Sequence, residues 1–145
     1  MTALSISPIT DADVAAVIAL WQRCGLTRPW NDPAGDIAFA RGSTNAAILV
    51  GRADGAIVGS VMVGHDGHRG WVYYVAIDPA QQRKDFGRAI MAAAEDWLRA
   101  RGVAKAMLMV RPDNTQVRAF YDRLGYDVQE RVIYAKWLDG REMTP

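Results

Sequence analysis

The chain has a single cysteine, Cys24, in 145 residues. A framework of disulfides within the chain is therefore excluded, and the composition fits a reducing compartment. A lone cysteine near the end of a helical segment is typically a packed, small apolar residue, and we expect no nucleophile here.

Neither sign of charge is in excess, because 17 Lys and Arg residues stand against 16 Asp and Glu residues. A net charge of +1 gives no broad basic field, so we expect no nucleic acid and no membrane as partner. No window reaches about 18 apolar residues, and the N-terminal MTALSISPIT lacks the features of a secretory signal. The protein is therefore expected to be cytoplasmic.

Linkers and internal repeats are also lacking, since no Ser/Gly-rich spacer, Pro-rich spacer or charge run interrupts the chain. We expect one domain over residues 1–145. Apolar periodicity and turn signals predict an α/β (α+β) fold with a mixed sheet and helices on both of its faces. The expected strands are 4–9, 46–53, 56–65, 71–77, 105–110 and one or two within 126–138, and the expected helices are 10–25, 32–41, 87–102 and 114–125.

One stretch, AIDPAQQRKDFGRAIM at residues 76–91, combines a strand, a Gly-containing loop and a helix start. The N-terminus of a helix presents free backbone N–H groups and a positive dipole end, which suits a pyrophosphate. Neither G-x-G-x-x-G nor G-x-x-x-x-G-K-[ST] is present, so the dinucleotide-binding and Walker patterns do not apply.

The loop instead resembles the acetyl-CoA signature Q/R-x-x-G-x-G/A of the GCN5-related N-acetyltransferases (GNAT), read from Gln82 to Gly87. A second stretch, RPDNTQVRAFYDRLGY at residues 111–126, resembles the N-x-x-A-x-x-F/L-Y-x-x-L-G-F/Y block of the same family. Two motifs in the family's order are far more specific than either alone. More narrowly, LTRPWNDP and HDGHRG look like the bacterial YpeA-type acetyltransferases.

The resemblance implies the GNAT fold, with a mixed, mostly antiparallel sheet of six to seven strands in which the fourth and fifth strands splay apart. It also implies an acetyl-CoA-dependent N-acetyltransferase that uses acetyl-CoA as co-substrate and no metal. A primary amine would attack the thioester directly in a ternary complex. The acceptor would be a small-molecule amine or an amine of a protein or peptide, and a homodimer is one expected assembly.

The family's binding roles carry over to residues of this chain. The backbone of the fourth strand would bind the pantetheine arm, and backbone N–H groups of residues 83–88 would cradle the pyrophosphate, with Arg83, Lys84 and Arg88 available for phosphate charge. Asn114 would contact the cofactor's amide region. Tyr121 would lie near the sulfur and protonate the leaving thiolate, because a phenol and a thiol have comparable pKa values. The implied cofactor-binding residues are Val75, Ala76, Ile77, Gln82, Arg83, Lys84, Asp85, Phe86, Gly87, Arg88, Asn114 and Tyr121.

The chain departs from the family in two places. Asp85 replaces a glycine of the signature, which adds a negative charge beside the expected pyrophosphate. Residues 71–77 hold no Asp or Glu, so the usual base for the ammonium is missing. Asp32, His68 or a water held by Tyr73 are candidate substitutes, and the expected acceptor-site residues are Trp30, Asn31, Asp32, His68 and Tyr73.

These departures leave a second hypothesis open. The chain would then be a degenerate, non-catalytic member of the same fold that binds CoA or acyl-CoA as a sensor or interaction module. Release of CoA in the presence of an amine separates the two hypotheses.

Overall fold

The computed structural model describes residues 3–82 and 84–143. The chain divides into two compact units, residues 1–109 and 110–145, and each is described by itself. The single domain expected over residues 1–145 stays a prediction.

The first unit is built on a five-stranded sheet in the order β1-β2-β3-β4-β5. Neighbouring strands are antiparallel except β4 and β5, which run parallel, so the expected mixed, mostly antiparallel sheet is confirmed. The strands are β1 (Ser5–Pro8), β2 (Ala46–Ala53), β3 (Ala56–His65), β4 (Gly70–Ile77) and β5 (Ala106–Met107).

The turn between β2 and β3 is formed by Asp54 and Gly55, which separate the expected strands 46–53 and 56–65. Asp54 has φ 51° and Gly55 has φ 79°, and two successive positive φ values are what a two-residue hairpin with a primed turn requires. Asp and Gly both tolerate this region, so the local sequence alone determines the connection.

The expected splay of the fourth and fifth strands is also confirmed. β5 is only two residues long, and it pairs with β4 at Gly70 with Ala106 and at Trp71 with Met107. Residues 72–77 of β4 continue without a β5 partner. This open edge of β4 is the feature of the sheet on which a further extended chain or ligand arm could pair.

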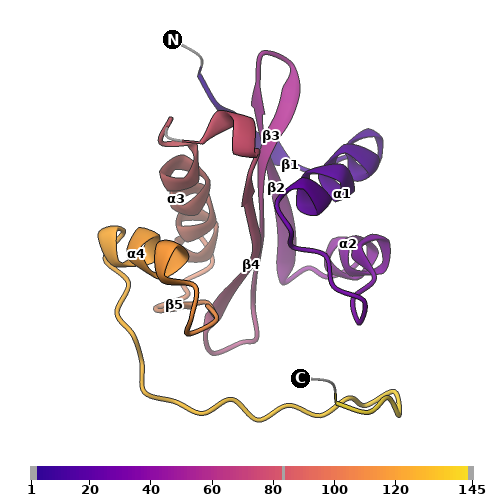
Figure 1. Ribbon diagram of the computed structural model, residues 1–145, viewed down its shortest axis with the longest axis vertical. Coiled ribbons are helices and arrows are strands. Elements are labelled where there is room, and N and C mark those ends of the chain that lie inside the picture. Colours follow the sequence, from indigo (N-terminus) through magenta and orange to yellow (C-terminus); the bar gives the residue numbers. More distant parts are fainter. Residues whose placement is uncertain (1–2, 83, 144–145) are drawn as a thin grey trace. The chain divides into compact units, whose positions relative to one another are not determined.

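Helices cover both faces of the sheet. In Figure 1, α1 and α2 lie on one face and α3 lies on the other. Thr10 and Asp13 form a capping box before α1, and Pro33 follows the N-cap Asp32 as the first residue of α2, where a proline is readily accommodated. The helical segments of this unit are η1 (Asp11–Asp13), α1 (Val14–Arg23), α2 (Pro33–Arg41), η2 (Pro79–Gln81) and α3 (Phe86–Arg99).

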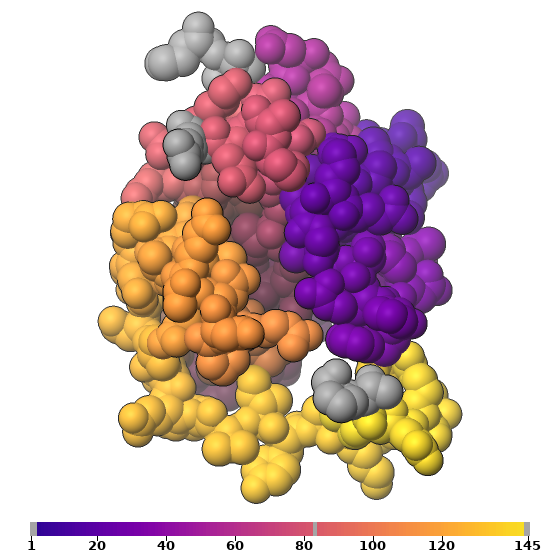
Figure 2. Space-filling model, viewed as in Figure 1, coloured from indigo at the N-terminus to yellow at the C-terminus, as the bar shows by residue number. Residues whose placement is uncertain are grey.

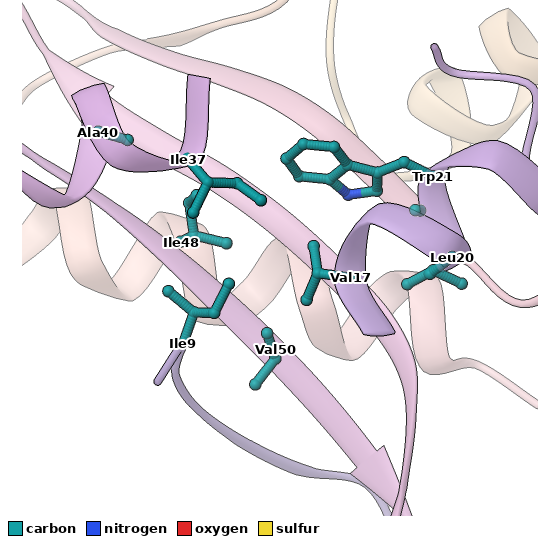
Figure 3. Packing of buried hydrophobic residues seen from close by; sticks show 9 residues of the cluster. Ile9, Val17, Leu20, Trp21, Ile37, Ala40, Ile48 and Val50 are labelled. Carbon is teal, nitrogen blue, oxygen red and sulfur yellow. The ribbon is translucent and has the colours of Figure 1, made fainter. Parts of the chain in front are cut away.

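The main core lies between the sheet and the pair α1 and α2. Trp21 of α1 and Ile37 of α2 pack over Ile48 and Val50 of β2, and all four side chains are at most 2% exposed. Figure 3 shows Trp21 and Ile37 above the same face of the sheet. This packing fixes α2 against the sheet and therefore fixes what its polar side chains can reach.

The second unit contains one helix, α4 (Thr115–Arg123), among its described residues. The strands expected within 126–138 are wrong, because no residue of this segment is in a strand. Val132, Tyr134 and Leu138 are exposed instead. A strand is stabilised by hydrogen bonds to a neighbour, and the described part of this unit offers none, so β propensity alone does not form one. The expected six to seven strands are therefore five in the described residues.

Candidate active site

A β-bulge interrupts β4 at Tyr74. Ser60 of β3 lies opposite Ala76, and Met62 lies opposite Tyr73, so Val61 alone faces two residues of β4. Tyr74 has φ 52°, a conformation that costs free energy for a bulky residue and persists only where its surroundings enforce it. Bulges of this kind re-aim a side chain and are common beside functional sites.

Two buried side chains hold the bulge in place. The Ser60 hydroxyl donates to the Tyr74 carbonyl oxygen at 3.0 Å and accepts from Trp21 Nε1 at 2.8 Å. The Tyr74 ring stacks on the Trp21 indole, with centroids 3.8 Å apart and planes 6° from parallel. Backbone and ring of Tyr74 are thus both fixed by neighbours on α1 and β3.

The hydroxyl of Tyr74 reaches α2. It donates a 2.7 Å hydrogen bond to Oδ2 of Asp36, and both residues are half-buried. Burial and the adjacent Asp36 raise the pKa of the Tyr74 phenol, so the hydroxyl remains a donor at neutral pH. The pair brings a carboxylate to the α2 side of the sheet, next to the bulge.

The end of β4 is tied to the end of α1. Cys24 Sγ donates to the Ile77 carbonyl oxygen at 3.3 Å, and Arg23 pairs with Asp78 at 3.1 Å. Burial, with a smaller contribution from Asp78, raises the pKa of the Cys24 thiol. A protonated, packed thiol agrees with the structural role expected for this cysteine. These contacts hold Val75, Ala76 and Ile77 beyond the point where β4 and β5 separate.

The predicted pyrophosphate loop lies at the surface, in the salmon-coloured region of Figure 2. Gln82, Lys84 and Arg88 are exposed, whereas Phe86 is buried and anchors the first turn of α3. Arg83 lies outside the described residues. Gly87 occupies the second position of α3, where backbone N–H groups have no partner within the helix.

Asp85 is the N-cap residue of α3 and has φ 61° and ψ 17°. This left-handed conformation explains a glycine at this position of the family signature, and Asp is among the residues that tolerate it. Its side chain makes no cap hydrogen bond and is exposed. Lys84 Nζ is bonded to Gln81 Oε1 at 2.9 Å.

The second unit carries the other two predicted cofactor residues on α4. Asn114 is the N-cap residue, and its Oδ1 accepts from the Val117 N–H at 3.2 Å. Tyr121 packs edge-on against Phe120 and Tyr126, with centroids 5.0 Å and 5.8 Å away. Burial raises the pKa of Tyr121 to about 12. The expectation that this phenol matches a thiol in pKa is therefore corrected, because the thiol value is near 8.5.

The predicted acceptor residues are spread over the first unit. Trp30, Asn31 and Asp32 lead into α2, and Asp32 makes no side-chain cap hydrogen bond. His68 lies in the turn before β4, where Asp66 Oδ1 accepts from its backbone N–H at 2.9 Å. Tyr73 is 43% exposed, stacks with Trp71 and pairs across the strands with Met62, which packs against the core that also holds Tyr74.

Sequence reasoning missed Asp36 and its partner Tyr74. The N-cap Asp32 and Asp36 are one helical turn apart, and this spacing is the sign in the sequence that a second carboxylate lies on the same side of α2.

Within residues 3–82 and 84–143, no three His, Cys, Asp or Glu side chains are grouped to hold a metal ion. The helices of the same residues are all too short or too polar to span a membrane.

Comparisons with known proteins agree with this geometry. The family described as "Acetyltransferase (GNAT) family" matches residues 10–126. An acetyltransferase of Yersinia enterocolitica is 41% identical over 135 residues, which are 93% of this chain and 96% of the relative. An acetyltransferase of Pectobacterium atrosepticum is 43% identical over 126 residues, which are 87% and 89% of the two chains.

Solved structures share the fold at low sequence identity. The aminoglycoside N-acetyltransferase AAC(6')-Iy in complex with CoA has a TM-score of 0.82 and 16% identity, over 95% of this chain and 97% of that one. PaiA N-acetyltransferase from Thermoplasma acidophilum, also in complex with CoA, has a TM-score of 0.78 and 16% identity, over 90% and 93% of the chains. From its family match and its curated relatives, the chain belongs to the acetyltransferase (GNAT) family.

Proposed function

We propose that the protein is an acetyl-CoA-dependent N-acetyltransferase that transfers the acetyl group to a primary amine by direct attack in a ternary complex. The observation that carries the proposal is the edge of β4, where β5 ends after two pairs and a rigid bulge at Tyr74 follows. Membership of the acetyltransferase family supports the same reaction.

The first unit suits the co-substrate chemically. The open edge of β4 at Val75, Ala76 and Ile77 would bind the amide groups of the pantetheine arm. The first turn of α3 offers unpaired N–H groups, and the exposed Lys84 and Arg88 offer positive charge for the phosphates. Gln82, Asp85, Phe86 and Gly87 complete the proposed loop, and Arg83 belongs to it by sequence only.

In the proposed reaction the neutral amine attacks the thioester carbonyl, so that a C–N bond forms and the C–S bond breaks. The developing negative charge on the carbonyl oxygen would be stabilised by backbone N–H groups of β4. The ammonium loses one proton to solvent before attack, and the nitrogen loses a second proton as the C–S bond breaks. That second proton balances the one that the leaving thiolate takes up.

Tyr121 is proposed to serve the leaving thiolate. With its pKa raised to about 12, the phenol is protonated at neutral pH and donates a hydrogen bond to the sulfur. Complete proton transfer from this phenol to a thiolate is uphill, so stabilisation by the hydrogen bond is the expected contribution. Asn114 would use its amide N–H groups for the cofactor, because its oxygen caps α4.

The acceptor is proposed to be a small-molecule amine. One solved structure with this fold is AAC(6')-Iy in complex with a bisubstrate analogue that joins CoA to an acetylneamine group. Its identity of 17% shows the fold alone, so the acceptor of this chain has to be found by experiment. A homodimer is part of the same proposal and is open to measurement of mass in solution.

The test is release of free thiol from acetyl-CoA with a panel of polyamines, aminoglycosides, amino acids and peptide N-termini. We expect amine-dependent release, and Tyr121→Phe should lower kcat by about 10- to 1000-fold without changing acetyl-CoA affinity. Tyr134→Phe is the matched control, since Tyr134 is 93% exposed. Tight binding of acetyl-CoA with no thiol release for any amine would instead favour the non-catalytic binding module.

A further inference from the structure

The hydrogen-bonded pair of Asp36 and Tyr74 is not explained by packing alone. Tyr74 is held by Trp21 and Ser60 in the core, and its hydroxyl ends on the Asp36 carboxylate at 2.7 Å. A tyrosine in a relaxed strand would alternate with its neighbours, whereas the bulge turns this one towards α2. The strained backbone conformation of Tyr74 is therefore the one that places its phenol against the Asp36 carboxylate.

The carboxylate of Asp36 keeps acceptor capacity after this bond. An ionised carboxylate has about four lone-pair sites, and Tyr74 occupies one of them. Asp11, Asp13 and Asp78 each form an ion pair with an arginine, but the ion pairs within the described parts of the chain do not include Asp36. The residue is half-buried, so it is not enclosed in the core.

The position of the pair relates it to the reaction. Tyr74 directly precedes Val75, the first residue of the proposed pantetheine-binding edge of β4. Helix α2 packs against β2 on the face of the sheet opposite to α3, and Asp36 connects it to β4 through the Tyr74 hydroxyl. A carboxylate there is suited to a cation that approaches the thioester from the α2 side. β4 itself carries no Asp or Glu, so Asp36 is a carboxylate close to a strand that has none of its own.

We infer that Asp36 binds the positively charged amine of the acceptor, and that Tyr74 is a positioning residue that orients its carboxylate. This inference rests on the proposed function and defines the acceptor class as aliphatic amines that are cationic at neutral pH. Charge-assisted hydrogen bonds to a fixed carboxylate are stronger than neutral ones. Water then takes the proton from the bound ammonium before attack, as in the reaction above.

The experiment compares acceptors of different charge. Spermidine represents cationic aliphatic amines, and aniline represents amines that are uncharged at neutral pH. Asp36→Asn keeps the shape and an oxygen that accepts from Tyr74 but removes the charge. We expect this variant to raise the KM for spermidine by about 10- to 100-fold and to change the KM for aniline less than about threefold. Tyr74→Phe keeps the ring stack and should raise the KM for spermidine by a smaller factor.

Two further variants test whether the change in KM for spermidine is specific to Asp36. Asp96→Asn removes one charge from the exposed far half of α3, where Asp96 is 77% exposed, and should leave both KM values unchanged. Asp32→Asn tests the neighbouring carboxylate at the N-cap of α2. A KM effect that appears in Asp32→Asn and is absent in Asp36→Asn would overturn the inference and assign the acceptor charge to Asp32.

Binding of spermidine to the CoA-loaded protein, measured by calorimetry, separates this inference from the proposed function. Loss of spermidine binding in Asp36→Asn supports the inference even where no acetyl transfer is found. Acetyl transfer to spermidine with the same KM in wild type and Asp36→Asn overturns the inference and leaves the proposed function standing. Wild-type protein that neither binds nor acetylates spermidine also overturns it.

Discussion

The indole N–H of Trp21 donates a 2.8 Å hydrogen bond to the hydroxyl of Ser60, although 39 residues separate the two in sequence. Ser60 is fully buried, and the same hydroxyl donates to the Tyr74 carbonyl oxygen. A small polar residue in the middle of β3 thus joins α1 to the bulge of β4. The candidate active site depends on this one hydroxyl for its backbone shape.

Ser60→Ala should destabilise the protein by about 1–3 kcal/mol, because it leaves a buried indole N–H and a buried carbonyl without this partner. Urea unfolding measures the change in free energy. Ser5→Ala, at an exposed position in β1, is the control and should change the free energy of unfolding by less than about 0.5 kcal/mol. Equal stability of Ser60→Ala and wild type would mean that the bulge does not need the hydroxyl.

The buried carboxylate of Asp13 gives a pH-dependent prediction. Asp13 Oδ2 accepts from Arg52 at 2.6 Å, and this hydrogen bond holds the pKa of Asp13 below its ordinary value. A lowered pKa contributes stability that is complete above the unfolded-state pKa, about 3.9, and is lost as the pH falls through the folded-state value. Asp13→Asn should therefore lower the free energy of unfolding by about 2 kcal/mol near pH 7, and by progressively less below about pH 4.

Unfolding by urea at several pH values checks this prediction. Asp11→Asn is a close control, because Asp11 also pairs with an arginine at 2.6 Å but is 95% exposed. Exposed ion pairs contribute little to stability, so Asp11→Asn should change the free energy of unfolding by less than about 1 kcal/mol at every pH. A cost for Asp13→Asn that does not change between pH 7 and pH 3 would contradict the assignment of the lowered pKa.

Asn114 has a structural contact and a proposed binding role that two substitutions can separate. Asn114→Ala removes the cap of α4 and should lower stability by about 1 kcal/mol, whereas serine can cap the helix in its place. Both variants lose the side-chain amide, so both should raise the KM for acetyl-CoA. Thermal unfolding and steady-state kinetics measure the two effects. A wild-type KM in Asn114→Ser would show that Asn114 acts as a cap alone.

Local chemistry made much of the fold predictable. Asp54-Gly55 specified a tight hairpin, and Asp32-Pro33 specified the start of α2, because each depends on the backbone preferences of two adjacent residues. The left-handed conformation of Asp85 belongs to the same class. Such features need no knowledge of distant partners.

Features that depend on pairing were not predictable. The bulge at Tyr74 arises from the register between β3 and β4, and it decides which of the two adjacent tyrosines meets Asp36. Sequence reasoning therefore overlooked Asp36 and its partner Tyr74, and the place of Tyr73 at the acceptor site stays a prediction. The prediction of strands within 126–138 was wrong for a related reason. β propensity says that a segment can form a strand, but it does not provide the neighbouring strand with which to pair.

Asp85 is the last residue to test, since its charge sits in the proposed pyrophosphate loop. The structure leaves that charge exposed, without a cap hydrogen bond, while the adjacent Lys84 is bonded to Gln81. Asp85→Gly and Asp85→Asn both remove the charge, and both residues accept a positive φ. Each should raise acetyl-CoA affinity by roughly tenfold if about 1.4 kcal/mol of repulsion survives screening.

Salt should narrow the affinity gap between wild type and Asp85→Asn, because screening weakens a repulsion that the neutral amide lacks. Calorimetric titration with acetyl-CoA at two ionic strengths measures this, and Asp96→Asn, which removes a charge from the other half of α3, should bind as wild type does. Asp85→Gly also relieves backbone strain, and the greater entropy of its unfolded chain partly offsets the resulting gain in stability. An increase in acetyl-CoA affinity seen with glycine and not with asparagine would therefore indicate backbone geometry rather than charge. Equal affinities for wild type, Asp85→Gly and Asp85→Asn would mean that this loop does not hold the pyrophosphate or that Asp85 points away from it.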